Sequence, residues 1–279
     1  MLRNLFVFSL ACIAFAAERG VDPTFLRRSI PDVPVKAGYR ALFGEGDAGA
    51  AHLKGISRFG EVTVGSAGTP PEESFSGEER IYFVTEGAGT LRYSGGDHAV
   101  RREDFFYVPP GVKHGLSISG ADPLRAIVMG FRIPKSATVK IPSKLLLANL
   151  ADVKKQTVGS HPPSTLYQLM IGDTRSTRDK IAAGHVVTSL FVMEITPGGT
   201  NHPHHHDTEE EIYFLLDGRG EMVAGGGMDG IEGRFPAKPG DAYFFRLNTT
   251  VGFYNASGPG ASTARILAVR SLYPRGRGE

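Results

Sequence analysis

Cysteine is almost absent from the sequence. Of 279 residues only Cys12 is a cysteine, and it falls within an apolar N-terminal stretch that we interpret below as a signal peptide. Removal of that stretch leaves a chain that forms no disulfide and has no thiolate to serve as nucleophile or metal ligand. We therefore expect a hydrophobic core, rather than covalent cross-links, to stabilise the mature protein.

An excess of charge of either sign is also absent. The chain has 31 lysines and arginines against 29 aspartates and glutamates, and loss of the N-terminal stretch removes only Arg3 from this balance. The remaining charge of +1 gives no reason to expect a polyanion partner, and no nucleic-acid-binding motif stands out. Arg275 and Arg277 lie among glycines and are interpreted as part of a frayed tail. The composition argues against nucleic-acid binding.

The apolar N-terminal run is too short to cross a membrane. Residues 5–16 are uncharged and largely apolar, they follow Arg3, and Ala14 and Ala16 supply the small residues of a cleavage site. This pattern is typical of a secretory signal peptide over residues 1–16; the alternative is a short buried N-terminal helix or strand. We expect a secreted or periplasmic protein that has no membrane segment after signal removal.

Long helical periodicity is missing as well. Hydrophobic residues make up 41% of the chain and glycines number 36, which suits an all-β fold with many turns. Residues 185–197 and 264–272 have the alternation and β-propensity of strands. Residues 144–155 are the exception, because this segment between prolines predicts a short helix.

An internal repeat indicates two domains. Residues 79–89 repeat as residues 210–220 at an offset of 131, and residues 103–108 correspond to residues 240–245 at an offset of 137. The larger second offset predicts a longer hairpin in the second copy, around residues 225–233.

The stretch 198–218 contains four of the nine histidines. His202, His204 and His206 share one parity, so on an extended chain their side chains project from the same face. Glu211 opens a strand-like run whose alternate residues face two sides, and Asp217-Gly218 then signals a turn. Imidazole and carboxylate ligands suit iron, manganese, nickel, zinc or cobalt, and two histidines with one carboxylate leave coordination positions open for a substrate.

The spacing of Gly198, His204, His206, Glu211 and Gly218 resembles the first signature of the cupins, G-x5-H-x-H-x4-E-x6-G, at every fixed position. The resemblance implies a small antiparallel jelly-roll barrel in which these two histidines and the glutamate bind one divalent metal ion.

Together with the repeat, the resemblance predicts an all-β chain of two cupin barrels. We expect the first barrel over residues 38–133 and the second over residues 163–275, joined by a linker of residues 134–162 that contains the short helix. Residues 17–37 are expected to form an N-terminal arm that packs across the second barrel.

The second cupin signature, G-x5-P-x-G-x2-H-x3-N, is incomplete in the second copy. Gly240 and Asn255 fit, but Arg246, Asn248 and Val251 replace its proline, glycine and histidine. The fourth ligand that the family implies is therefore missing. The site is then a two-histidine, one-carboxylate triad, or a neighbour such as His202 replaces the lost ligand, or metal affinity is poor.

Other residues of the same stretch are given lesser roles. His205 has the opposite parity and is expected to face outward. Glu209 and Glu210 are rival carboxylates that we place in the turn before the strand, and Glu211 is preferred on register.

The first copy has lost the metal ligands. Glu73, Phe75 and Arg80 occupy the positions of His204, His206 and Glu211, although His114 still matches the second signature. We therefore expect no metal there. One hypothesis is that Arg80 and His114 hold an anion inside the barrel; the alternative is that Arg80 pairs with Glu73 or another internal carboxylate.

Two functional hypotheses follow. The first is a metalloenzyme that acts on a small oxygen-rich organic molecule, with dioxygenase, decarboxylase or isomerase chemistry; Tyr243 and Tyr254 are candidate catalytic residues among aromatic residues that otherwise form the core. The second is a non-catalytic bicupin that binds a small ligand or has a structural or sensory role. Both imply a small-molecule partner, and the resemblance allows a homo-oligomer formed through barrel faces.

Overall fold

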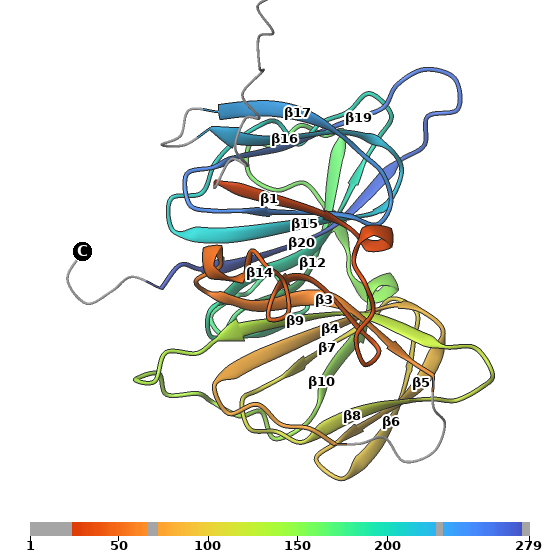
Figure 1. The fold of residues 1–279 in the computed structure, drawn as a ribbon, viewed down its shortest axis with the longest axis vertical. Coiled ribbons are helices and arrows are strands. Elements are labelled where there is room, and N and C mark those ends of the chain that lie inside the picture. Colours follow the sequence, from red (N-terminus) through yellow and green to blue (C-terminus); the bar gives the residue numbers. More distant parts are fainter. Residues whose placement is uncertain (1–23, 66–71, 227–230, 275–279) are drawn as a thin grey trace, which may run out of the picture.

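The computed structural model describes residues 24–65, 72–226 and 231–274. The predicted signal peptide and the first residues of the arm lie outside these ranges. The regular structure in the described residues consists of β-strands and three single-turn 3-10 helices. Figure 1 shows two strand-built barrels stacked along the long axis of the molecule. None of the described helices has the length and apolarity needed to span a membrane.

The first barrel is made of two antiparallel sheets. Its strands are β2 (Tyr39–Gly44), β3 (Ile56–Val64), β4 (Glu78–Glu86), β5 (Ala88–Tyr93), β6 (Gly96–Arg101), β7 (Asp104–Val108), β8 (His114–Ile118), β9 (Leu124–Arg132) and β10 (Leu146–Asn149). The large sheet has the order β10-β7-β4-β9-β3-β2, and the small sheet has the order β6-β5-β8.

The second barrel repeats this arrangement. Its strands are β1 (Phe25–Ser29), β11 (Lys155–Gln156), β12 (Thr165–Asp173), β13 (Ile181–Gly184), β14 (Val187–Ile195), β15 (Glu209–Asp217), β16 (Gly220–Gly226), β17 (Ile231–Ala237), β18 (Asp241–Phe245), β19 (Thr250–Asn255) and β20 (Ala264–Leu272). The large sheet has the order β1-β18-β15-β20-β14-β12-β11, with β13 beside β12, and the small sheet has the order β17-β16-β19. The two-barrel, all-β fold is thus confirmed, and the β16–β17 hairpin is longer than its β5–β6 counterpart.

Alternate residues of the central strands belong to different cores. In β15, Tyr213 and Leu215 pack inside the second barrel, whereas Ile212 and Phe214 pack in a core that the two barrels share. Successive side chains of a strand point to opposite faces, so a strand at the junction is buried on both sides. The two faces predicted for this run are confirmed. Gly218, at φ +83°, then turns the chain into β16, as the Asp217-Gly218 pair predicts.

Two buried glutamates connect the barrels reciprocally. The carboxylate of Glu79, in the first barrel, accepts hydrogen bonds from three successive backbone amides of the second barrel, those of residues 185–187, at 2.9 to 3.2 Å. The carboxylate of Glu210, at the equivalent position of the second barrel, accepts from the amides of residues 54–56 of the first barrel at 2.7 to 3.2 Å. Both glutamates are fully buried. Each carboxylate therefore satisfies a run of amides that the partner barrel leaves unpaired.

The position of Glu210 corrects the sequence interpretation. Glu209 and Glu210 are the first residues of β15 rather than parts of the preceding turn. Glu211 points into the barrel, so the alternation of the strand turns Glu210 to the opposite face, where it meets the other barrel.

The N-terminal arm joins the second barrel, as expected. Strand β1 pairs antiparallel with β18, with Phe25 opposite Phe245 and Leu26 opposite Phe244. The arm therefore covers the edge of the large sheet of the second barrel, which is the more distant barrel along the chain (Figure 1).

The helix predicted over residues 144–155 is wrong. This segment forms strand β10, the 3-10 turn Leu150–Asp152 and strand β11. Strand β10 pairs with β7 of the first barrel, and β11 pairs with β12 of the second. The apolar residues alternate between two cores: Leu145 and Leu147 pack inside the first barrel, and Leu146 and Ala148 pack against the shared core. The uncovered edge of β7 decides the conformation, because it offers both backbone partners and two apolar faces.

Candidate metal centre

The loop from β14 to β15 aligns the histidines with the small sheet of the second barrel. His204 exchanges two backbone hydrogen bonds with Val251 of β19, at 2.9 and 2.8 Å. The His206 carbonyl oxygen accepts a hydrogen bond from the Asn248 amide at 2.9 Å. With the backbone held in this extended path, His204 and His206 face the same side, as their spacing predicts. His205 faces out, and its imidazole lies 3.3 Å from the Asp207 carboxylate.

His204, His206 and Glu211 come together inside the second barrel. One ligand atom from each lies within 4.8 Å of the others, and this is the one such cluster in the part of the chain that the structure describes. The Nε2 atom of His206 lies 3.2 Å from Oε2 of Glu211, yet neither atom has a hydrogen bond of normal geometry. Buried polar atoms without partners are costly. A divalent cation shared by these groups would remove that cost, so the residues present fit a metal ion.

The electrostatics of the cluster favour a positive charge at its centre. Burial lowers the pKa of His204 and so keeps its imidazole neutral. Burial acts in the same direction on His206, but the neighbouring Glu211 carboxylate outweighs it and raises the pKa of His206. That carboxylate is 2% exposed and is the negative charge that a bound cation would balance.

His202 does not join the cluster. It is exposed and adopts a left-handed backbone conformation with φ +55°. Its backbone carbonyl oxygen, rather than its imidazole, contacts the cluster, because this oxygen lies 2.9 Å from Nδ1 of His204. A hydrogen bond there places the proton on Nδ1 and leaves Nε2 free as a metal ligand.

Val251, which replaces the histidine of the family signature, supplies no ligand. Val251 pairs with His204 in the same way that His114 pairs with Glu73 in the first barrel. Its side chain is buried in the core of the second barrel.

A cavity of about 90 Å³ opens beside the three clustered residues. Its wall consists of Val158, His161, Tyr167, Leu169, Arg178, Ser189, Phe191, His204, His206, Glu211, Tyr213 and Arg270. Glu211, Arg270 and Ser189 lie side by side, because the strand register pairs Glu211 with Arg270 and Arg270 with Ser189. The ladder of β15, β20 and β14 thus places a carboxylate, a guanidinium and a hydroxyl in one row.

Besides His206 and Glu211, three of these wall residues have polar atoms without hydrogen-bond partners. They are the Tyr167 hydroxyl, the Ser189 hydroxyl and Nε of Arg270, and all three atoms are buried. Burial raises the pKa of Tyr167, so its hydroxyl stays protonated and able to donate. The Arg270 guanidinium donates to Glu209 through Nη1 at 3.2 Å, which holds the side chain in place.

The two tyrosines proposed as catalytic residues do not line this cavity. Tyr243 is fully buried under Arg27, and its hydroxyl donates to the Pro236 carbonyl oxygen at 3.5 Å. Tyr254 packs against Arg234. The tyrosines in the wall are Tyr167 and Tyr213, of which Tyr213 shares the parity of Glu211 and could have been recognised from the sequence.

The sequence reasoning also missed His161, Ser189 and Arg270. All three lie outside the histidine stretch. A single sequence holds no signal for the strand register that brings Ser189 and Arg270 beside Glu211, or for the loop path that brings His161 beside His204.

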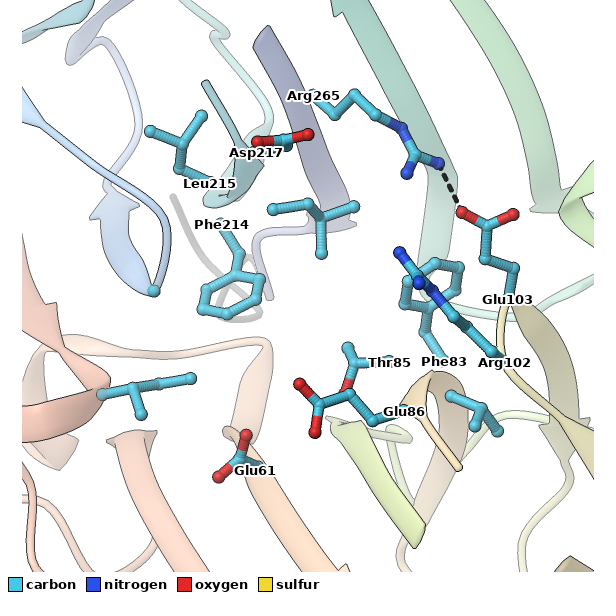
Figure 2. A pocket seen from close by; sticks show the side chains of 14 residues that line it. Glu61, Phe83, Thr85, Glu86, Arg102, Glu103, Phe214, Leu215, Asp217 and Arg265 are labelled. Atoms are coloured by element: carbon cyan, nitrogen blue, oxygen red, sulfur yellow. Dashed lines mark hydrogen bonds and ion pairs between the residues drawn. The ribbon is translucent and has the colours of Figure 1, made fainter. Parts of the chain in front are cut away.

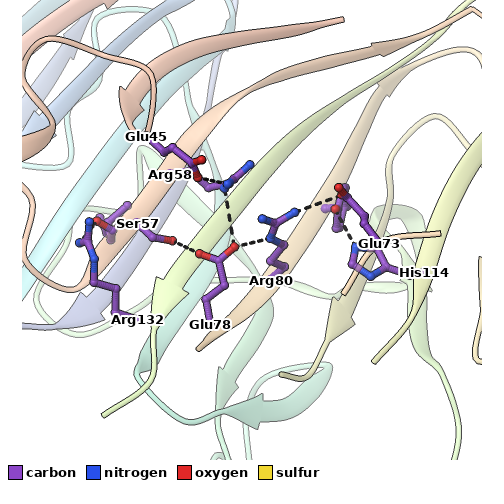
Figure 3. Close-up of polar contacts among 10 residues, drawn as sticks. Glu45, Ser57, Arg58, Glu73, Glu78, Arg80, His114 and Arg132 are labelled. Atoms are coloured by element: carbon purple, nitrogen blue, oxygen red, sulfur yellow. Dashed lines mark hydrogen bonds and ion pairs between the residues drawn. The ribbon is translucent and has the colours of Figure 1, made fainter. Parts of the chain in front are cut away.

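The first barrel has a different polar network at the equivalent place. Arg80, which corresponds to Glu211, has a 2% exposed side chain and pairs with Glu78 and with Glu73, the latter at 3.2 Å (Figure 3). Its guanidinium lies over the Phe75 ring. His114 lies 2.8 Å from the Tyr82 hydroxyl, and burial lowers its pKa. Carboxylates thus pair with Nε and Nη1 of Arg80, as the alternative interpretation expects.

A larger cavity, of about 320 Å³, lies between the barrels. Figure 2 shows its charged rim, where Arg265 of the second barrel and Glu103 of the first are joined at 2.7 Å. Glu61, Glu86 and Asp217 also line it, but no metal-ligating cluster among the described residues includes them. The cavity by the histidines is therefore the better candidate site.

The fold and the site define a protein of two fused jelly-roll barrels, one of which contains a cluster of candidate metal ligands. The family model described as "Cupin domain" matches residues 60–130 and 191–269, more than half of the chain and once in each barrel. The chain belongs to the cupin family. No curated protein matches the sequence.

Several solved structures share the fold at low sequence identity. A Pseudomonas aeruginosa protein assigned as glyoxylate-induced is 15% identical, with a TM-score of 0.71 and coverage of 92% of both chains. Protein Ylba of E. coli is 16% identical, with a TM-score of 0.64 and coverage of 93% of this chain and 96% of that chain. An oxalate decarboxylase of Lactobacillus farciminis is 13% identical, with a TM-score of 0.63 and coverage of 89% and 86%. At these identities the similarity establishes the two-barrel fold and not the activity.

Proposed function

We propose that the protein is a divalent-metal-dependent enzyme that acts on a small, oxygen-rich organic molecule in the second barrel. The observation that carries the proposal is a set of buried atoms without hydrogen-bond partners around one cavity: His206 Nε2 and Glu211 Oε2 on the metal side, and the hydroxyls of Tyr167 and Ser189 with Nε of Arg270 in the adjoining wall.

The metal-side residues have the chemistry of an open catalytic site. His204, His206 and Glu211 would hold the cation, and two histidines with one carboxylate leave positions for substrate oxygens. A bound divalent cation would supply Lewis-acid or redox chemistry. The sequence and structure leave iron, manganese, nickel, zinc and cobalt as candidates. A solved oxalate decarboxylase of Bacillus subtilis has Mn(II) centres, which supports testing manganese first.

The remaining wall residues indicate what the substrate presents. Tyr167, Ser189 and Arg270 offer hydrogen-bond donors, and a guanidinium favours a carboxylate or another anionic oxygen. A cavity of about 90 Å³ has room for about three water molecules at roughly 30 Å³ each, so it accommodates a group of a few heavy atoms beside the metal ligands. The solved oxalate decarboxylases, one of them in complex with formate, are consistent with such a substrate class.

The first test is elemental analysis of the protein purified without added metal or chelator. We expect about one transition-metal ion per chain in the wild type, and none in a His204→Ala/His206→Ala variant. His205→Ala is the matched control, because this exposed histidine lies in the same stretch but outside the cluster. Absence of metal from the wild type after reconstitution with each candidate ion would sink the proposal.

A second experiment separates an enzyme from a non-catalytic binder. Metal-loaded protein is screened with small carboxylates for oxygen consumption and carbon dioxide release, before and after treatment with a chelator. The enzyme requires turnover that is lost on chelation. Ligand binding that survives chelation, without turnover, would indicate the second functional hypothesis.

A further inference from the structure

The linker between the barrels brings a histidine to the edge of the metal cluster. His161 lies between β11 and β12, and its ring centroid is 5.1 Å from that of His204 at an interplanar angle of 68°. This is close to the arrangement of the two clustered histidines, whose centroids are 4.9 Å apart at 87°. His161, His204 and His206 line the same cavity.

The hydrogen bonding of His161 matches that of a metal ligand. Its Nδ1 atom lies 2.6 Å from the Asn201 carbonyl oxygen. A carbonyl only accepts, so Nδ1 carries the proton and Nε2 keeps its lone pair. His204 has the same arrangement with the His202 carbonyl oxygen. A hydrogen bond from the non-ligating nitrogen to a carbonyl is the usual support of a metal-bound histidine.

The support beneath His161 is rigid. Asn201 is fully buried, its side-chain amide donates to the Tyr213 hydroxyl at 3.0 Å, and its side-chain oxygen accepts from the Phe253 amide at 2.8 Å. Within the described residues, the Nε2 atom of His161 has no hydrogen-bond or ion-pair partner of its own. The ring is thus oriented by a fixed residue while its ligating nitrogen is left free.

We infer that His161 is the fourth protein ligand of the metal centre and takes the role that the family gives to a histidine at position 251. The inference rests on the metal site of the proposed function. The Nε2 atom of His161 stands outside the group of three donors that lie within 4.8 Å of one another, so coordination draws it toward them. Residues 157–164 lie between β11 and β12, and this approach leaves the strand ladders intact.

The test measures metal affinity, which needs no knowledge of the substrate. Mn(II) and Co(II) dissociation constants are determined by chelator competition for the wild type, His161→Ala and His161→Asn. The asparagine variant keeps a donor for the Asn201 carbonyl while removing the imidazole. We expect both variants to bind at least about tenfold more weakly, with a changed Co(II) visible spectrum, and His205→Ala, at an exposed histidine outside the cluster, to match the wild type.

A rescue variant tests the exchange of roles directly. Val251→His in the His161→Ala background restores the family's ligand on β19, and we expect affinity to recover. Wild-type affinity and an unchanged Co(II) spectrum in both His161 variants would overturn the inference while leaving the three-ligand site in place. A wild type that binds no metal would instead overturn the proposed function together with the inference. Far-UV circular dichroism of each variant checks that the barrels are folded.

Discussion

Positions 80 and 211 show how one residue sets the chemistry of a barrel. They are equivalent in the repeat, and both side chains are 2% exposed. Glu211 brings a negative charge to two imidazoles, whereas Arg80 brings a positive charge to Glu73 and Glu78. A guanidinium cannot ligate a cation, and like charges repel in a medium of low dielectric. The first barrel therefore uses the position for an internal ion pair.

This role predicts the effect of Arg80→Met. The change leaves Glu78 without its nearest cation, although Arg58 and the Ser57 hydroxyl still contact that carboxylate. A hydrogen bond to a charged group contributes about 1.5 to 3 kcal/mol, so we expect a loss of that order in the free energy of unfolding, measured by urea denaturation. Arg92→Met removes an exposed pair with Asp97 and serves as the control, with no measurable shift expected. Equal midpoints for the two variants would contradict the buried role of Arg80.

At the scale of elements, a strand from outside the repeated segment pairs with the edge of the large sheet in each barrel. Strand β1 covers β18, and β10 covers β7, in equivalent places. The alternation of residues 210–216 and the repeat were sufficient to predict the central strands and their two faces. The run of residues 145–148 was ambiguous, because a continuous apolar segment fits a helix or a doubly buried strand. Only the position of β7 distinguishes the two.

Removal of β1 should destabilise the second barrel. We compare a chain that begins at Thr24 with one that begins at Ile30, which lacks Phe25 and Leu26, 9% and 5% exposed in the structure. Burial of each of these two side chains contributes about 1.5 to 3 kcal/mol, which the shorter chain lacks. The edge of β18 also loses its paired strand. We expect a lower thermal midpoint by scanning calorimetry for the shorter chain. Identical midpoints would show that β1 adds nothing to the stability of the sheet.

For the whole molecule, the junction between the barrels is a third core rather than a surface contact. Phe59 and Phe83 of the first barrel and Phe214 and Phe244 of the second are buried in it together. Gly55 is required there, because a Cβ atom would lie 2.6 Å from the Leu272 carbonyl oxygen. Its amide meets Glu210, so close packing and the glutamate bonds depend on each other.

The reciprocal glutamates predict a matched pair of variants. Glu79→Ala and Glu210→Ala each leave two buried backbone amides and one partly buried amide of the partner barrel without acceptors. At about 1 to 3 kcal/mol for each unsatisfied group, we expect a loss of at least about 3 kcal/mol for either variant by urea unfolding. Glu221→Ala, at an exposed position of β16, is the control. If either glutamate variant matched the control, the bonds across the junction would not be holding the barrels together.

The sequence alone determined the features that depend on local spacing. The repeat, the strand parity, and the Gly198 to Gly218 pattern placed His204, His206 and Glu211 on inward faces of one barrel, because side-chain direction alternates along any strand. Tertiary structure alone decided which distant residues meet: His161 beside His204, Arg270 and Ser189 beside Glu211, and Glu210 against the opposite barrel. These contacts depend on the register between strands and on how two sheets pack, and neither is specified by the spacing of residues within one segment.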